Sequence, residues 1–108
     1  MVEQIEYTLL EPINISVKGE FKKVSEVILK APKGRHVKYI DEIVKHDKDG
    51  NAKLSFEGVL KLLCCGDIMF TKEHNIALSS DSEFRDLNLA TINALTGTYI
   101  ANFNFFSL

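Results

Sequence analysis

The sequence lacks the motifs that mark the common enzyme classes. It has no glycine-rich phosphate-binding loop, no His-Glu pair at the spacing of a zinc protease, and no serine in a nucleophile elbow. No catalytic constellation is found among its residues. We therefore expect a protein that is not an enzyme and that needs no cofactor.

Cysteine is scarce, and its placement excludes a disulfide framework. The only two cysteines, Cys64 and Cys65, are adjacent, and a disulfide between neighbours is strained and rare. Adjacent thiolates also lack the spacing of zinc ligands, so a metal site or nucleophile pair with His74 is disfavoured. We expect two reduced thiols at the end of an apolar helix.

Signals for secretion and for membrane insertion are weak. The first residues carry acids where a signal peptide has a basic segment. Residues 87–108 have no charged side chain, but four Asn, three Thr and a Gly would make insertion into a bilayer costly. We expect a cytosolic protein that binds no membrane.

Net charge is small, at −2, so no overall field predicts nucleic-acid binding. The charge is uneven, however. Residues 17–53 hold ten of the thirteen basic residues and six of the fifteen acids. This basic segment either meets an acidic partner or is a set of solvated lysines, and the sequence leaves both open.

Apolar periodicity predicts an α+β domain that spans residues 1–108, with an N-terminal β-hairpin or small antiparallel sheet followed by three to four helices. Residues 1–30 are rich in β pattern: "IEYTLL" and "INISV" alternate on either side of Pro12, and Gly19 makes a turn before "KVSEVIL". Residues 34–97 have helical patterns, and residues 98–108 form an aromatic tail.

The helical half contains several start and stop signals. A helix is predicted within "RHVKYIDEIVKH", a second from Ser55 to near Gly66, and a short third one in "TKEHNIAL". Ser80 and Glu83 have the spacing of a capping box for a last helix that Gly97 would close. The tail alternates like a strand, although helical spacing fits it as well.

The segment "HDKDGNAKLSFEG" resembles a calcium-binding loop between two helices. Asp47, Asp49, Asn51 and Ser55 fall at the first, third, fifth and ninth positions of such a loop. Ala52 stands where glycine is needed, and Gly58 replaces the bidentate glutamate. We interpret the segment as a polar turn with Ser55 as a helix cap, and a degenerate calcium site remains the alternative.

Aromatic residues gather at the end of the chain, where they either join the core or face a partner. For a partner surface, we predict that these side chains provide the anchor and that lysines of the basic segment steer the approach. The predicted partner-binding residues are Tyr99, Phe103, Phe105, Phe106, Lys22, Lys23, Lys30 and Lys33.

The order of elements resembles the Mu-like family of bacteriophage tail assembly chaperones. The matching pattern is a Leu-x-x-Pro-Ile element, a glycine turn, an apolar strand, a proline break and a helix. It is carried by Leu10, Pro12, Ile13, Gly19, Val24, Val27, Leu29 and Pro32. Leu78, Ser79, Asp86 and Leu87 continue it, with extra residues between them.

This resemblance implies a non-enzymatic chaperone that binds the tape-measure protein or tail-tube subunits during tail assembly. It also implies a place in the host cytoplasm and absence from the mature virion. Formation of homo-oligomers is a further option that the sequence leaves open. A small phage-encoded inhibitor of a host protein would have the same size and charge and remains an alternative, as does the calcium-binding module.

Overall fold

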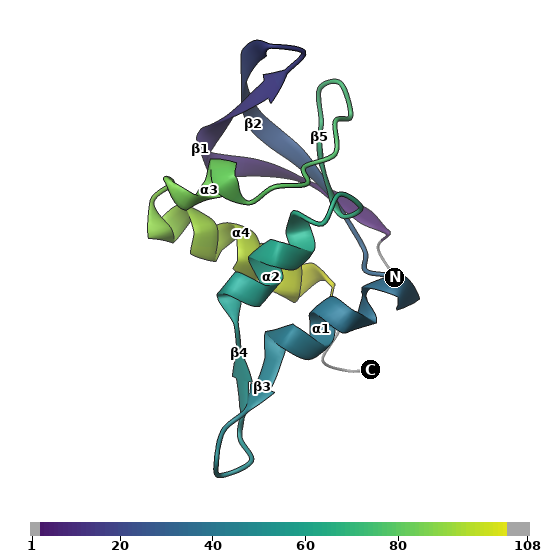
Figure 1. The fold of residues 1–108 in the computed structure, drawn as a ribbon, viewed down its shortest axis with the longest axis vertical. Coiled ribbons are helices and arrows are strands. Elements are labelled where there is room, and N and C mark those ends of the chain that lie inside the picture. Colours follow the sequence, from purple (N-terminus) through teal and green to yellow (C-terminus); the bar gives the residue numbers. More distant parts are fainter. Residues whose placement is uncertain (1–2, 104–108) are drawn as a thin grey trace.

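The computed structural model describes residues 3–103, apart from the side chain of Ala52. It confirms an α+β fold, in which an N-terminal hairpin belongs to a three-stranded antiparallel sheet and is followed by helices (Figure 1). In chain order the elements are β1 (Gln4–Val17), β2 (Glu20–Lys30), a 3₁₀ helix (Gly34–His36), α1 (Val37–Ile43), β3 (Val44–His46), β4 (Ala52–Leu54), α2 (Phe56–Leu63), β5 (Met69–Thr71), α3 (Ser82–Arg85) and α4 (Leu89–Asn102).

The long hairpin of β1 and β2 turns at Lys18 and Gly19, as the sequence predicts. Both residues have positive φ, 52° and 81°, which suits the twist of a two-residue hairpin loop. Pro12 does not divide β1 into two strands. Four residues separate Thr8 from Ile13 in β1, where one residue separates their partners in β2. Pro12 lies in this bulge. Proline has no backbone N–H to donate, and at a bulge the pairing with β2 does not require one.

The third strand of the sheet is β5, which pairs with the C-terminal half of β2. The predicted helix in "TKEHNIAL" is therefore wrong. The chain turns after Thr71, whose side-chain hydroxyl accepts a hydrogen bond of 2.9 Å from the Ile76 N–H. It then returns beside Phe70, which forms an antiparallel bridge with Ala77. Pairing with a distant strand overrides the local helical propensity here.

The first predicted helix is present as α1, but it ends at Ile43. Residues 44–46 form β3 and pair with β4 in a second, two-stranded sheet. The next helix, α2, starts after Ser55 as predicted. Gly58 lets α1 and α2 approach closely, since a Cβ there would lie 3.1 Å from Ile43 Cγ1 and 3.2 Å from Ile43 Cα.

The predicted helix from Ser80 to Gly97 is divided in two. Asp81, not Ser80, precedes the short α3, and its side chain makes no capping bond. A new helix, α4, then begins after Asn88 and continues through Gly97 to Asn102. The described part of the aromatic tail is therefore helical, and the strand interpretation is wrong for residues 98–102.

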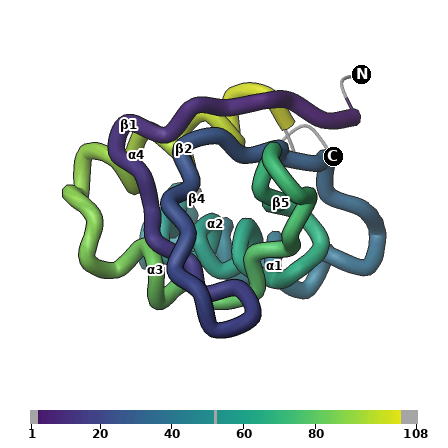
Figure 2. The backbone as a smooth tube through the Cα atoms, turned by 90° about the horizontal axis from the view of Figure 1, so that it is seen from above, coloured from purple at the N-terminus to yellow at the C-terminus, as the bar shows by residue number. Residues whose placement is uncertain are grey.

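The helices cover one face of the three-stranded sheet, and the core fills the space between them. From above, α4 runs alongside the N-terminal part of β1 while α2 lies beneath the sheet (Figure 2). The molecule is elongated, 48 × 28 × 20 Å, with the β1–β2 turn and the β3–β4 turn at opposite ends. Within residues 3–103, no helix has the length and apolarity to cross a membrane.

Candidate functional site

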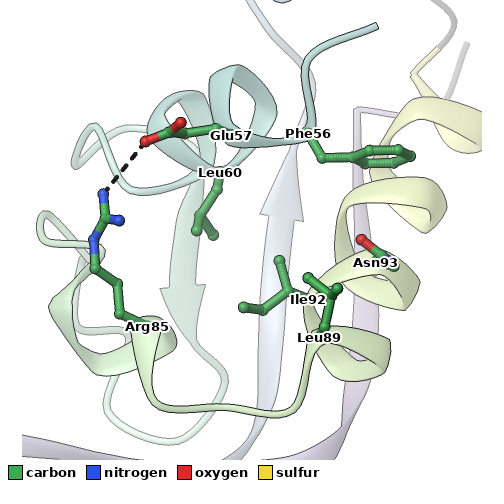
Figure 3. Close-up of a pocket in the computed structure, with 7 residues that line it drawn as sticks. All are labelled: Phe56, Glu57, Leu60, Arg85, Leu89, Ile92 and Asn93. Carbon is green, nitrogen blue, oxygen red and sulfur yellow. Dashed lines mark ion pairs between the residues drawn. The ribbon is translucent and has the colours of Figure 1, made fainter.

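An apolar groove of about 270 Å³ lies between the N-terminal ends of α2 and α4 (Figure 3). We call it the α2–α4 groove. Its lining residues are Phe56, Glu57, Leu60, Arg85, Leu89, Ile92 and Asn93. Phe56 and Leu89 are 42% and 69% exposed, which is unusual for side chains of this size.

Two helix caps place these apolar side chains at the groove. The Ser55 hydroxyl accepts a hydrogen bond of 3.1 Å from the Gly58 N–H, so α2 begins at Phe56. The Asn88 side-chain oxygen accepts one of 2.8 Å from the Ala90 N–H, so α4 begins at Leu89. Each helix thus starts with a large apolar residue, and Figure 3 shows Phe56 pointing toward α4.

A contact with β1 fixes the start of α4. The Glu11 carboxylate accepts a hydrogen bond of 2.7 Å from the Asn88 N–H, across 77 positions of sequence. The negative charge at this helix N-terminus also complements the helix dipole, and the first turn of α4 itself contains no acid. Leu10, which is also exposed, directly precedes Glu11.

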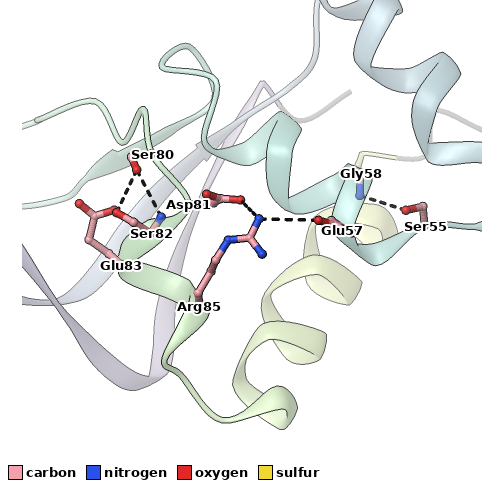
Figure 4. A network of polar contacts seen from close by, with 8 residues as sticks. All are labelled: Ser55, Glu57, Gly58, Ser80, Asp81, Ser82, Glu83 and Arg85. Carbon is pink, nitrogen blue, oxygen red and sulfur yellow. Dashed lines mark hydrogen bonds and ion pairs between the residues drawn. The ribbon is translucent and has the colours of Figure 1, made fainter.

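The polar side of the groove is an ion-pair network (Figure 4). The Arg85 guanidinium donates to Asp81 at 2.7 Å and lies 3.6 Å from a Glu57 oxygen. The hydrogen bond and charge of Asp81, and then the charge of Glu57, raise the pKa of Arg85 above its ordinary value. Two carboxylates around one guanidinium leave this border negative.

The chemistry of the groove is that of a docking surface. Phe56, Leu60, Leu89 and Ile92 offer apolar contact, and Asn93 offers a side-chain amide. Its charged groups, Glu57 and Arg85, face each other. This arrangement can hold an apolar side chain of another molecule and discriminate by charge at the rim.

The structure corrects the predicted aromatic anchor. Tyr99 and Phe103 lie in the core, 0% and 6% exposed, with ring centroids 4.9 Å apart. They are buried because α4 turns this face toward the sheet, where the Tyr99 hydroxyl donates a hydrogen bond to the Lys30 carbonyl. In this conformation neither ring is available to a partner. Phe105 and Phe106 lie outside the described residues.

The predicted lysines do not form one patch. Lys22 pairs with the buried Ile15 and is directed to the inner face of the hairpin, whereas Lys23 pairs with Asn14 on the outer face. Lys30 lies over the ring of Phe70 on the sheet, 4.3 Å from its centroid. Lys33 is exposed at the start of the 3₁₀ helix. Their use for steering stays a prediction.

The calcium-like segment is a hairpin turn between β3 and β4, not a loop between two helices. The Asp47 carboxylate accepts hydrogen bonds of 2.9 Å from the N–H groups of Asp49 and Asn51. Ser55 caps α2 instead of facing the turn. In the described part of the chain, no group of three or more His, Cys, Asp or Glu side chains is arranged to hold a metal ion.

Both cysteines are free, as expected. Cys64 is buried at the end of α2, and burial raises the pKa of its thiol to about 12. The nearby charges of Asp81 and Glu83 act in the same direction. A thiol held in its neutral form is a poor nucleophile, which fits a packing role.

Comparison with protein-family models, curated proteins and solved structures gives no match to this chain.

Sequence reasoning missed the groove because apolar periodicity identifies the apolar residues of a helix but does not show which of them stay exposed. The available signal was the position of Phe56, which directly follows a recognised N-cap and so stands at the edge of its helix. Leu89 also directly follows an N-cap, Asn88, but that cap was not recognised in the sequence. Phe21 lies outside the groove, but it is a further exposed ring that the sequence analysis did not identify. Its position between two charged residues, Glu20 and Lys22, was the available signal.

Proposed function

We propose that this chain is a non-enzymatic phage tail assembly chaperone that holds a tape-measure or tail-tube protein at the α2–α4 groove. The observation that carries this proposal is the exposure of Phe56 and Leu89 on either side of one apolar groove. Exposed apolar surface of this kind marks sites where another protein docks. The class of partner rests on the resemblance to the Mu-like tail assembly chaperones.

The composition of the groove supports binding over catalysis. Leu60 and Ile92 complete an apolar floor, and the charged side chains at the rim are paired. A chaperone needs such a surface to cover apolar segments of a structural protein before assembly. In this proposal the chain acts in the host cytoplasm and is absent from the mature virion, as the resemblance implies.

Co-expression with a tape-measure protein and a tail-tube protein from the same genome tests this function. We expect the wild-type chain to increase the soluble fraction of one of them and to co-purify with it. Leu89→Ser and Phe56→Ser should each reduce recovery of the complex about tenfold or more, since central apolar contacts dominate binding.

Val37→Ser is the matched control. Val37 is 51% exposed but lies on α1, outside the groove, so this variant should co-purify like the wild type. If the wild type recovers neither protein, the chaperone function is wrong. If the wild type binds but Leu89→Ser and Phe56→Ser bind equally well, the groove is not the binding site.

A further inference from the structure

A second exposed apolar feature is the tip of the β1–β2 hairpin. Phe21 is 84% exposed and pairs with Ser16 on the outer face of the hairpin. Lys23 lies two residues further along β2 and therefore on the same face. The tip stands at one end of the long axis of the molecule, away from the helices (Figure 1).

The tip and the α2–α4 groove have opposite charge. At the tip, Lys23 shares the outer face with Phe21 and Lys18 lies in the turn, while Lys22 and the one acid, Glu20, are on the inner face. The border of the groove has two acids, Glu57 and Asp81, against the single cation Arg85. A basic aromatic tip and an acid-bordered apolar groove are complementary in both charge and polarity.

The groove also has room for an aromatic ring. Its volume is about 270 Å³, and an apolar cavity of about 150 Å³ is enough to hold benzene. The Phe21 ring does not reach the groove of its own chain, since 84% of it is exposed. A second copy is therefore the molecule that brings the two surfaces together.

We propose that the α2–α4 groove of one copy binds the Phe21 hairpin tip of a second copy. The Phe21 ring enters between Phe56 and Leu89, and Lys23 approaches the acidic border at Glu57. Because the two surfaces differ, each bound copy still offers a free tip or a free groove, and association continues head to tail.

This inference rests on the proposed function, because both use the same groove. Self-association covers the apolar side chains until a tail protein displaces the tip. The contact is small, a single ring with a short polar rim, so the association is weak and concentration-dependent.

Sedimentation velocity over a concentration series tests the contact. We expect the average mass of the wild type to rise with concentration up to about 1 mM, which is the range for weak contacts. Phe21→Ser removes the tip and Leu89→Ser damages the groove, so each variant alone should remain a monomer at every concentration. Both side chains are largely exposed, and circular dichroism should show the wild-type fold.

Mixing the two variants gives the decisive result. The intact tip of Leu89→Ser should enter the intact groove of Phe21→Ser, so the mixture should form heterodimers and nothing larger. Phe56→Ser serves as a second groove variant if Leu89→Ser loses its fold. Lys23→Glu should weaken wild-type association about threefold to tenfold, and added salt should weaken it too.

Three results would overturn the inference. The first is a wild type that stays a monomer at every concentration. The second is a Phe21→Ser variant that associates like the wild type, and the third is a mixture of the two variants that stays monomeric. The experiment needs no tail protein, so its failure is distinct from failure of the chaperone function. A wild type that self-associates but recovers no tail protein leaves this contact standing and removes only the function.

Discussion

The Tyr99 hydroxyl donates a hydrogen bond of 3.0 Å to the backbone carbonyl of Lys30, which joins the end of α4 to the end of β2. These residues are 69 positions apart in the sequence. The Lys30 N–H donates a hydrogen bond to the Ile68 carbonyl, so the backbone N–H and the backbone carbonyl of Lys30 are both hydrogen-bonded. The contact places the C-terminal helix on the sheet and explains why its aromatic face is buried.

Tyr99→Phe should therefore lower the free energy of unfolding by about 1–2 kcal/mol, since the part-buried Lys30 carbonyl loses its tyrosine donor. Urea unfolding followed by circular dichroism measures this. Tyr39→Phe is the matched control, because the Tyr39 side chain is only partly buried and packs beside Lys38. The control should stay within about 0.5 kcal/mol of the wild type. Equal effects of the two variants would mean that the bond to Lys30 contributes nothing.

Phe103 and Phe21 give a second contrast, between a buried and an exposed ring. Phe103→Ala should cost about 3 kcal/mol, since its ring is 6% exposed and packs against Tyr99. Phe21→Ala should change stability by less than about 0.5 kcal/mol, because its ring is in water. Thermal unfolding of the two variants measures the difference. A stable Phe103→Ala variant that has lost partner binding would restore the aromatic end as an anchor.

Gly58 and Gly97 are both helical glycines, but only one of them has space for a side chain. At Gly58 a new Cβ would press on the Ile43 backbone, at 3.2 Å from its Cα, so Gly58→Ala should destabilise the protein by about 1–3 kcal/mol. Nothing lies within 4 Å at Gly97, so Gly97→Ala should stabilise it by about 0.5–1 kcal/mol through helix propensity. Opposite signs in chemical denaturation are the expected result. A stabilising Gly58→Ala would show that α1 moves aside without cost.

Features encoded within a short window could be predicted from the sequence. The β1–β2 turn depends on the pair Lys18 and Gly19, and the start of α2 depends on the Ser55 cap, which bonds a residue three positions away. The turn at Asp47 is equally local, since its carboxylate bonds residues two and four positions on. Such contacts act before the rest of the chain folds, so local pattern is enough to find them.

Features that depend on distant partners could not be predicted. The sequence predicts a helix start at Ser80 with Glu83, but the long helix starts after Asn88, whose N–H is bound by Glu11 from β1. β5 forms because β2 offers a free edge, which no window around Thr71 reveals. The groove needs both Phe56 and Leu89, and their proximity depends on how α2 packs against α4. Whether the side chains of Phe56 and Leu89 are exposed depends on how the whole chain packs, so the sequence alone does not show it.

The buried Cys64 thiol predicts a loss of stability in alkali. Burial raises its pKa to about 12 from 9.0, so the unfolded chain releases this proton at a lower pH than the folded chain does. Between these values the unfolded state binds fewer protons, and the free energy of unfolding must fall as the pH rises. The Cys64 contribution is fully present below pH 9 and should fall by about 2 kcal/mol by about pH 10.5.

Urea unfolding at pH 8 and at about pH 10.5, for Cys64→Ala and Cys65→Ala beside the wild type, isolates this contribution. Cys65→Ala keeps the buried thiol and should lose stability with pH nearly as the wild type does. Cys64→Ala is less stable at pH 8, because it leaves a small cavity, but it should lose about 2 kcal/mol less on going to high pH. Cys65 contributes to the raised pKa values of both Cys64 and Tyr99, so Cys65→Ala should lose slightly less stability with pH than the wild type. The difference between Cys64→Ala and the wild type therefore isolates Cys64. If all three proteins lose the same amount, the thiol of Cys64 ionises as easily in the folded chain as in the unfolded one, and its burial does not control its protonation.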